Sequence, residues 1–347
     1  SFLPVIDYIR TVADDPSVIA IKQTVYRTGT DSELMQILVE AARKGKEVTV
    51  VVELMARFDE EVNMNWAERL DEVGAHVVYG VVGHKTHAKM SLIVRREENE
   101  SGKAALRRYV HLATGNYHPR TARLYTDFGL MTSNEEICAD VNEVFKQLTG
   151  LGRVSRLKHL WQSPFTLHKR IVAAIRNEAK QAAEGKPARI IAKMNALLEP
   201  QIIEELYLAS MAGVKIDLVV RGVCALKPGI EGLSQNIRVR SVVGRFLEHS
   251  RVFYFQNGGA EDVYLASADW MGRNFFRRIE LCFPVLDAGL KKRVIREGLL
   301  PYLDDNTQAW VMTSEGSYER LKPRKGGRRR SAQEELLFTL GVPSSSV

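Results

Sequence analysis

Continuous apolar runs alternate along the chain with longer segments whose apolar residues recur at helical spacing, and this order occurs twice. The apolar runs are 19–26 and 48–53 in the first copy, and 189–195 and 216–221 in the second. Helical segments separate them, over 31–42 in the first copy and through Leu206 and Ala209 in the second. Continuous apolar strands are typical of sheets buried on both faces, so the pattern predicts an α/β protein with covering helices and a diverged internal repeat.

Glycines occupy the same place in the two copies. Gly45 and Gly213 follow the helical segment and precede the second strand, where a helix commonly ends on a left-handed residue. The charged stretch 95–108 lacks an apolar period, and we expect a solvated hairpin loop there.

The chain has 347 residues, a length that fits about two domains. Gly150 to Ser163 has the features of a boundary, because a helix ends on glycines and the next begins at Ser163-Pro164. We therefore predict a first domain over 1–157, a second over 158–315 and a basic C-terminal tail over 316–347.

The formal net charge of +7 favours polyanionic partners without choosing among them. No apolar run reaches the ~20 residues of a membrane span. The three cysteines lie far apart and form no zinc spacing, so we expect buried thiols in a reducing compartment.

Two short segments contain the candidate chemistry. Each places a histidine two residues before a cation, as His87 before Lys89 and His249 before Arg251. Side chains at i and i+2 of a strand point to the same face, so each imidazole is expected to project with its cation. One such pair in each half predicts a bipartite site for a phosphoryl group.

A neutral imidazole accepts a phosphoryl group well, and its ordinary pKa of ~6.5 leaves it largely neutral near pH 7. The oxygens of the transferring group need cations, and Lys89 and Arg251 meet that need. Arg27 and Arg57 follow strands of the first copy, and Arg221 ends a strand of the second. No Walker-type phosphate loop occurs. The remaining histidines have no repeat partner; His84, His111 and His118 lie near the motif, whereas His76, His159 and His168 are expected to be structural.

Several longer motifs, in order along nearly the whole chain, resemble the polyphosphate kinase family. They are 21–27, 53–61, 87–89, 114–116 and 121–127 in the first half, and 218–222, 246–252 and 267–271 in the second. The resemblance implies two tandem phospholipase D-like domains, each a mixed sheet covered by helices on both faces. It also implies reversible transfer of the terminal phosphate of ATP to inorganic polyphosphate, with Mg²⁺, through a phosphohistidine.

The resemblance assigns roles residue by residue. His87 matches the phosphohistidine nucleophile, and His249 matches a second histidine that binds the nucleotide and acts as general acid or base. Tyr125 and Arg221 match nucleotide-contacting positions, and Asn116 and Arg251 are expected to bind substrate. Arg27 and Arg57 match positions assigned to magnesium. Because a guanidinium has no acceptor, we expect both to bind phosphate oxygens beside the metal.

The family also carries two domains before this region, one of which contributes to the nucleotide site and the other to dimerisation. The chain is therefore expected to be a catalytic C-terminal portion without these two domains. Whether it includes the N-terminal strand of its own first domain is left open. Expected partners are ATP, ADP and polyphosphate, with no specific nucleic acid and no integral membrane segment, and a homo-oligomer for the full-length protein. The expected location is the cytoplasm, with peripheral membrane association left open.

Two other functions remain open. One is a phosphodiesterase or nuclease of the phospholipase D type, although Val94 stands where the His-x-Lys-x4-Asp signature needs aspartate and Arg251 stands where it needs lysine. The other is a non-catalytic module that binds polyanions through its charge.

Overall fold

The computed structural model describes residues 2–27, 29–53, 60–81, 83–98, 102–152 and 156–341. It divides into two compact units. The first contains Ser1–Phe165 together with Phe276–Cys282, and the second contains Thr166–Phe275 together with Phe283–Val347. A short segment from late in the chain therefore belongs to the first unit.

A mixed sheet forms the centre of the first unit, in the order β3-β2-β1-β5-β6-β8. Its strands are β1 (Val18–Val25), β2 (Glu47–Val52), β3 (His76–Val78), β5 (Lys89–Glu98), β6 (Ala104–Ala113) and β8 (Gly129–Thr132). The β1–β2 and β2–β3 pairs are parallel, whereas β1–β5, β5–β6 and β6–β8 are antiparallel.

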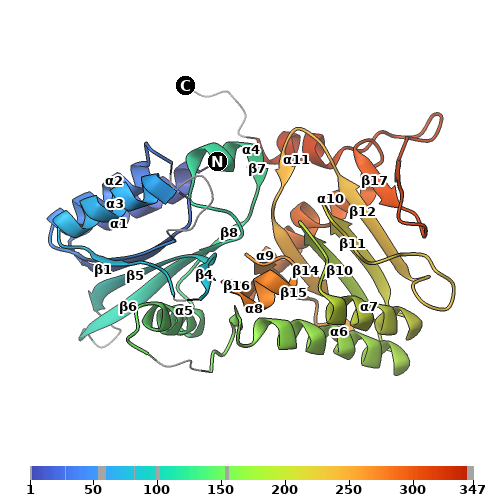
Figure 1. Ribbon diagram of the computed structural model, residues 1–347, viewed down its shortest axis with the longest axis horizontal. Helices are drawn as coiled ribbons and strands as arrows, with labels where there is room; N and C mark the ends of the chain where they lie inside the picture. The colour runs from blue at the N-terminus through green and yellow to red at the C-terminus, as the bar shows by residue number, and fades with distance from the viewer. Residues whose placement is uncertain are drawn as a thin grey trace. The chain divides into compact units, whose positions relative to one another are not determined.

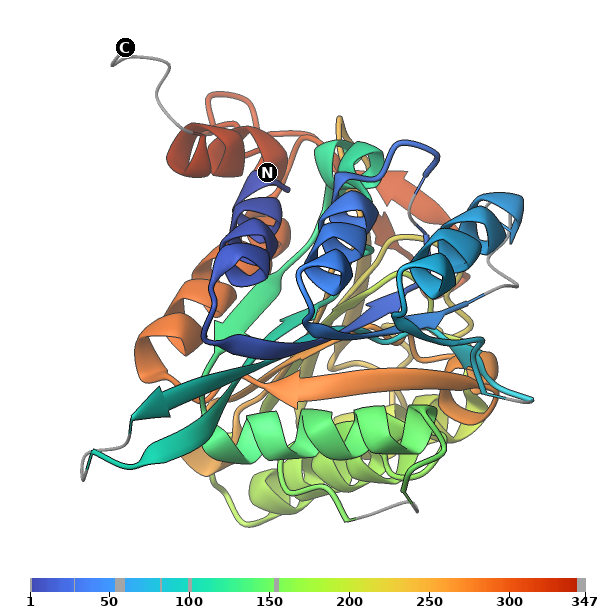
Figure 2. The same ribbon diagram turned by 90° about the vertical axis from the view of Figure 1, so that its left-hand side faces the viewer.

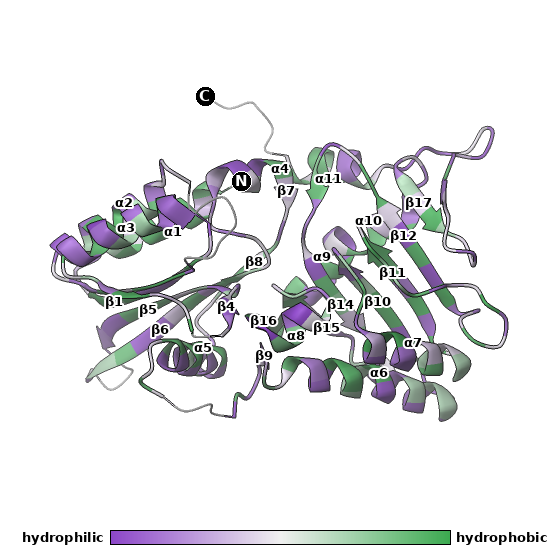
Figure 3. Cartoon of the chain, viewed as in Figure 1, coloured by the Kyte–Doolittle hydropathy of each residue, from purple (hydrophilic) through white to green (hydrophobic). Residues whose placement is uncertain are grey.

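Helices cover both faces of this sheet (Figures 1 and 2). One face carries α1 (Leu3–Asp14), α2 (Glu33–Arg43) and α3 (Glu60–Glu72), and the other carries α5 (Glu135–Leu148). Ser32 starts α2 by accepting a hydrogen bond from the Met35 amide, and Leu34, Met35 and Leu38 are buried in the core beneath it. The covering helices show both hydrophobic and hydrophilic residues in Figure 3, as expected for amphipathic helices.

Shorter elements complete the first unit. Strand β16 (Arg278–Pro284) pairs in parallel with β4 (Lys85–Thr86) and antiparallel with β9 (Trp161–Ser163). Helix α4 (Pro119–Leu124) leads directly into β7 (Tyr125–Thr126). The pairing of β16 with β4 positions the late segment beside His87.

The second unit has its own sheet, in the order β18-β17-β12-β11-β10-β14-β15. The strands are β10 (Arg189–Met194), β11 (Lys215–Val220), β12 (Ile237–Val242), β14 (Arg251–Phe255), β15 (Asp262–Ala266), β17 (Ala309–Met312) and β18 (Tyr318–Arg320). Helices α6 (Leu167–Ala183) and α7 (Pro200–Met211) pack together (Figure 1). The remaining elements are α8 (Gly272–Phe276), α9 (Ala288–Gly298), α10 (Leu300–Asp304), α11 (Ala332–Leu340), β13 (Leu247–Glu248) and a 3-10 turn, η1 (Asn257–Gly259).

The internal repeat predicted from the sequence is present. In each copy the first strand pairs in parallel with the strand after the helix and antiparallel with the strand after the histidine, as β1 with β2 and β5, and β10 with β11 and β14. Gly45 and Gly213 have φ of 83° and 96°, which confirms the predicted left-handed positions after α2 and α7.

One segment differs from the expectation. The stretch 95–108 is largely paired β structure, because β5 and β6 continue as a hairpin in which Arg95 opposes Arg107 and Glu98 opposes Ala104. The expected solvated loop was therefore too long. Exposed strands carry polar residues on both faces, so they lack an apolar period just as a loop does. The segment 316–347 contains β18 and α11, and Ala332 is buried in a cluster with Val219, Val242 and Tyr302.

Within the part of the chain that the structure describes, no helix has the length and apolar character needed to cross a membrane.

Candidate active site

His87 lies at the break between β4 and β5, where its backbone is held by β16. The amides of His87 and Ala88 both donate to the Ile279 carbonyl, each at 2.9 Å. The run 86–90 is therefore not one continuous strand, as the sequence pattern suggested. The side chains nevertheless project together as expected, because both lie against the ring of Tyr26. The His87 ring meets it edge-on, with 4.7 Å between the two ring centroids, and the Lys89 ammonium lies 5.1 Å from the Tyr26 centroid.

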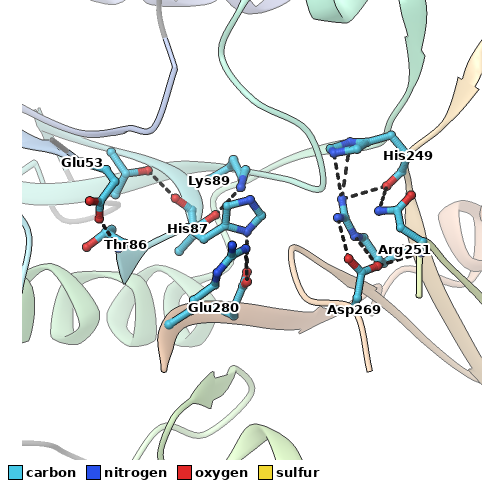
Figure 4. Close-up of polar contacts among 12 residues, drawn as sticks. Glu53, Thr86, His87, Lys89, His249, Arg251, Asp269 and Glu280 are labelled. Carbon is cyan, nitrogen blue, oxygen red and sulfur yellow. Dashed lines mark hydrogen bonds and ion pairs between the residues drawn. The ribbon is translucent and has the colours of Figure 1, made fainter. Parts of the chain in front are cut away.

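Glu280 of β16 orients the His87 ring (Figure 4). Its Oε2 lies 2.9 Å from Nδ1 of His87, and the Glu280 side chain is fully buried. Arg278, on the same strand, lies 3.8 Å from the other carboxylate oxygen. The Lys89 ammonium donates to the backbone carbonyl of His87. A carboxylate and two cations thus surround the imidazole.

Burial lowers the pKa of His87 to about 3, with Lys89 and Arg278 acting in the same direction and Glu280 opposing them. Burial alone would raise the pKa of Glu280, but His87, Lys89 and Arg278 lower it below its ordinary value. At neutral pH Glu280 is therefore a carboxylate that accepts from Nδ1–H of a neutral imidazole. The lone pair lies on Nε2, to which no hydrogen bond is made within the described ranges.

A second buried carboxylate supports the same turn. The Thr86 amide donates to Oε2 of Glu53 at 2.7 Å, and Glu53 directly follows β2. The Asn63 side chain of α3 donates to the backbone carbonyls of Glu53 and Tyr26, at 2.9 and 3.1 Å. These contacts fix the ends of β1 and β2 against the His87 turn.

One of the predicted phosphate-binding arginines, Arg27, lies just after the end of β1. Arg27 follows Tyr26, whose ring contacts His87, and is partly buried. Arg57 lies outside the described residues.

Asn116 lies in the turn after β6, and Tyr125 is the first residue of β7. The Thr114 hydroxyl donates to Oδ1 of Asp127 at 2.7 Å, which holds the start of this segment. A Cβ on Gly115 would lie 2.2 Å from Oδ2 of Asp127, so only glycine fits the close approach. Asn116 accepts a backbone hydrogen bond from His118 at 2.9 Å, and Tyr125 is partly buried.

In the second unit the Arg251 guanidinium contacts both the backbone and the ring of His249 (Figure 4). Its Nη1 donates to the His249 carbonyl at 2.8 Å and lies 3.2 Å from Nε2 of the ring. Asp269 accepts from Nε and Nη2 of Arg251, at 3.2 and 3.1 Å, and also from the Asn195 amide at 2.7 Å. Burial alone would raise the pKa of Asp269, but Arg251, the Asn195 amide and His249 lower it, so this buried pair is ionised.

The two histidine segments share one contact and differ in another. In each, the cation two residues later donates to the carbonyl of the histidine. The buried carboxylate is placed differently, because Glu280 contacts the ring of His87 whereas Asp269 contacts the guanidinium of Arg251. The first arrangement selects an imidazole tautomer, and the second offsets the charge of the cation.

Arg221 follows the last residue of β11. Its amide donates to the Met194 carbonyl at 3.1 Å, and its own carbonyl accepts from the Ser241 hydroxyl at 2.9 Å. The structure therefore places this residue at the end of β11, where the sequence predicted it. The neighbouring strand β10 ends at Met194.

Two family models match consecutive parts of the chain. Polyphosphate kinase C-terminal domain 1 matches residues 1–154, and polyphosphate kinase C-terminal domain 2 matches residues 160–333. The chain belongs to the polyphosphate kinase family.

Curated polyphosphate kinases show the same relationship. Those of Paraburkholderia phytofirmans and Burkholderia cenocepacia are 66% and 67% identical over 337 residues, which is 97% of this chain and 49% of each relative. The chain spans about half the length of the curated relatives it matches.

Solved structures agree with the fold. The polyphosphate kinase of Porphyromonas gingivalis is 37% identical, with a TM-score of 0.90 over 98% of this chain and 51% of that one. The phosphatidylserine synthase of Haemophilus influenzae, at 10% identity and a TM-score of 0.54, covers 86% of each chain and shares the fold alone. The expected mixed α/β fold is therefore confirmed.

No motif in the sequence predicts a role for Glu280, Asp269 or Glu53. Glu280 interrupts an apolar run between Ile279 and Leu281, and this pattern could have identified it as a buried carboxylate. A carboxylate in such a run is buried and needs a partner. Nothing in the sequence shows that the partner is a histidine 193 positions earlier.

Within the described ranges, the donor set of this polyphosphate kinase family member offers no protein cage for magnesium. No group of three histidine, cysteine or carboxylate side chains able to hold a metal occurs among the described residues. Arginine cannot ligate a cation. Magnesium is commonly bound largely through substrate phosphates.

Proposed function

We propose that this chain is the catalytic portion of an ATP:polyphosphate phosphotransferase, which transfers the terminal phosphoryl group of ATP reversibly to inorganic polyphosphate through phosphate on His87. The observation that supports this proposal most directly is the contact between Nδ1 of His87 and Glu280, at 2.9 Å. It holds a neutral imidazole in the tautomer whose Nε2 is the nucleophile.

In the first step Nε2 of His87 attacks the terminal phosphorus in line. An N–P bond forms, and the bond between phosphorus and the ADP oxygen breaks with its electron pair leaving on ADP. The ring gains positive character as the N–P bond forms, and the Glu280 carboxylate stabilises it. This is the role that a buried carboxylate has beside a catalytic histidine.

In the second step a terminal oxygen of polyphosphate attacks the phosphorus, and the N–P bond breaks with its electron pair returning to Nε2. Lys89, Arg27 and Arg57 are proposed to bind the equatorial oxygens in both steps, because charge stabilisation dominates phosphoryl transfer. Lys89 is 3% exposed and contacts the His87 carbonyl, which supports its assignment.

His249 is proposed to serve the nucleotide half of the reaction by assisting the ADP oxygen as it departs or attacks. Its segment matches the family motif, and Arg251 beside it offers a guanidinium held by Asp269. Tyr125, Arg221 and Asn116 are proposed to contact the nucleotide or polyphosphate. Mg²⁺ is proposed to be bound to the substrate phosphates, and no step is assigned to it.

The wider expectations belong to the same proposal. ATP, ADP and polyphosphate are the proposed partners, the cytoplasm is the proposed location, and homo-oligomerisation is proposed for a longer protein that contains this sequence.

The test is peptide mass spectrometry after mixing the chain with long-chain polyphosphate and magnesium, with digestion at alkaline pH to preserve phosphohistidine. Phosphate is expected on His87, absent in His87→Asn and unchanged in His76→Asn, which alters an exposed histidine of the same unit. An acid-labile phosphate that survives in His87→Asn would exclude the proposed nucleophile. Product release from a phosphodiester without magnesium would favour the phosphodiesterase alternative.

A further inference from the structure

Helix α11 contacts the backbone that leads into His249, although none of its residues belongs to the proposed site. The side chain of Gln333 is buried, with 3% of the residue exposed. Its Oε1 accepts from the Phe246 amide at 2.9 Å, and its Nε2 donates to the Phe246 carbonyl at 2.8 Å. The same Nε2 donates to Oε1 of Glu248 at 2.6 Å. One amide therefore holds three groups within the residues just before His249.

The second oxygen of Glu248 is bound from the sheet. Lys193 of β10 is 1% exposed, and its ammonium donates to Oε2 of Glu248 at 2.6 Å and to the Ser250 hydroxyl at 2.8 Å. The ammonium also lies 3.9 Å from the centre of the Tyr302 ring. Glu248 and Ser250 flank His249, so Lys193 fixes both of its neighbours.

Helix α11 is itself firmly attached. The Ala332 amide donates to Oδ2 of Asp305 at 2.8 Å, and Asp305 is 1% exposed. A Cβ on Gly244 would lie 2.4 Å from Oε1 of Gln333, so the chain before Phe246 approaches this amide as closely as a glycine allows. The connection from Asp305 through Gln333 to Glu248 has little room to adjust.

We propose that Gln333 and Lys193 are positioning residues for His249, and that α11 thereby sets the geometry of the nucleotide half of the reaction. The proposal rests on the function proposed above for His249. A buried carboxylate is costly unless each oxygen is bonded, so Glu248 adopts the one position that satisfies both Gln333 and Lys193. His249 lies between β13 and β14, with Glu248 and Ser250 as its neighbours in the chain, so fixing both neighbours restrains the backbone that carries its ring.

The test compares Gln333→Met with Glu334→Met. The first keeps the length of the side chain and loses its three hydrogen bonds. The second makes the same type of change at the next residue of α11, which is exposed. Two readouts are needed: the ring NMR signals of His249, assigned by comparison with His249→Asn, and the rates of the two half-reactions, which are labelling of His87 by polyphosphate and discharge of that phosphate to ADP.

In Gln333→Met the His249 ring signals are expected to shift, and discharge to ADP to slow by about 10-fold to 100-fold, the cost of a positional error of roughly 1 Å, while labelling of His87 stays within about twofold. Glu334→Met is expected to match the wild type in both readouts. Unchanged His249 signals in Gln333→Met, or an equal fall in both half-reactions, would overturn the positioning role. The equal fall would indicate a structural role only.

A variant that fails to fold does not end the test. Gln333→Asn keeps the amide but shortens the side chain by one methylene, and the same comparison applies to it. If the wild type shows no phosphate on His87, the proposed function fails. The NMR comparison still decides whether α11 positions His249.

Discussion

The Glu280 carboxylate lies 2.9 Å from Nδ1 of His87 and comes from a strand 193 positions later in the chain. Both residues are buried, and burial is the main reason that the pKa of His87 falls to about 3. The contact gives the imidazole one tautomer and gives the buried carboxylate its partner. In the proposed reaction the histidine therefore attacks without first losing a proton.

Replacing the carboxylate by an amide tests this arrangement. Glu280→Gln keeps the shape of the side chain but can donate to Nδ1, which would move the ring proton to Nε2. We expect labelling of His87 by polyphosphate to slow by about 100-fold or more, within the range for loss of a proton-positioning group. Glu98→Gln, at the exposed end of β5, is the control and should label at the wild-type rate. Equal rates in Glu280→Gln and the wild type would contradict the orienting role.

Stability should depend on pH through His87. The unfolded chain binds a proton to this histidine below about pH 6.5, whereas the folded protein does not until about pH 3. The free energy of unfolding should therefore fall as the pH is lowered through this window, by up to about 1.4 kcal/mol per pH unit from this group.

Urea unfolding of the wild type and of His87→Asn between pH 7 and pH 5 measures this contribution. The variant should lose less stability on acidification than the wild type. Parallel pH profiles would show that His87 takes up its proton equally in both states.

The Asp269–Arg251 pair gives a prediction for the second unit. Asp269→Asn leaves the buried guanidinium of Arg251 without its carboxylate, which should cost roughly 3 kcal/mol of stability. Discharge of phosphate from His87 to ADP should slow more than labelling of His87 by polyphosphate, since Arg251 is assigned to the nucleotide half. Rapid-quench measurement of each half-reaction gives the rate of labelling and the rate of discharge separately. A uniform loss in both would assign Asp269 to folding alone.

Gly115 gives a steric prediction. The Cβ of Gly115→Ala would lie 2.2 Å from the Asp127 carboxylate, so the turn that carries Asn116 must shift. Overpacking of this kind costs about 1–3 kcal/mol. Gly272→Ala is the matched control, because no atom lies within 4 Å of the added Cβ. Urea unfolding should separate the two variants, and equal stability would mean that the turn around Asp127 yields freely.

Local patterns predicted much of this molecule. The apolar runs that became β1, β2, β10 and β11 and the glycines after α2 and α7 were visible because strand burial and helix termination depend on near neighbours in sequence. The duplicated spacing singled out His87 and His249 among the histidines for the same reason. The break of backbone pairing at His87 was not visible, because Ile279 of a distant strand binds its amide.

The partners of the two histidine segments could not be found in this way. Glu280 reaches His87 because β16 pairs with β4 far along the chain, and Asp269 reaches Arg251 because it follows β15, which pairs with β14. The role of 316–341 was missed for a related reason. Its basic residues obscured the short helix α11, whose proposed role rests on the three hydrogen bonds of Gln333 with Phe246 and Glu248.

The membership of Phe276–Cys282 in the first unit has a consequence for synthesis of the protein. A ribosome completes residues up to Phe165 long before it reaches Glu280, so the nascent first unit holds His87 without its carboxylate. Truncated or prematurely terminated chains would share that defect. The order of synthesis therefore withholds the oriented imidazole until most of the second unit has also been translated, and incomplete products lack the carboxylate that orients the proposed phosphate acceptor.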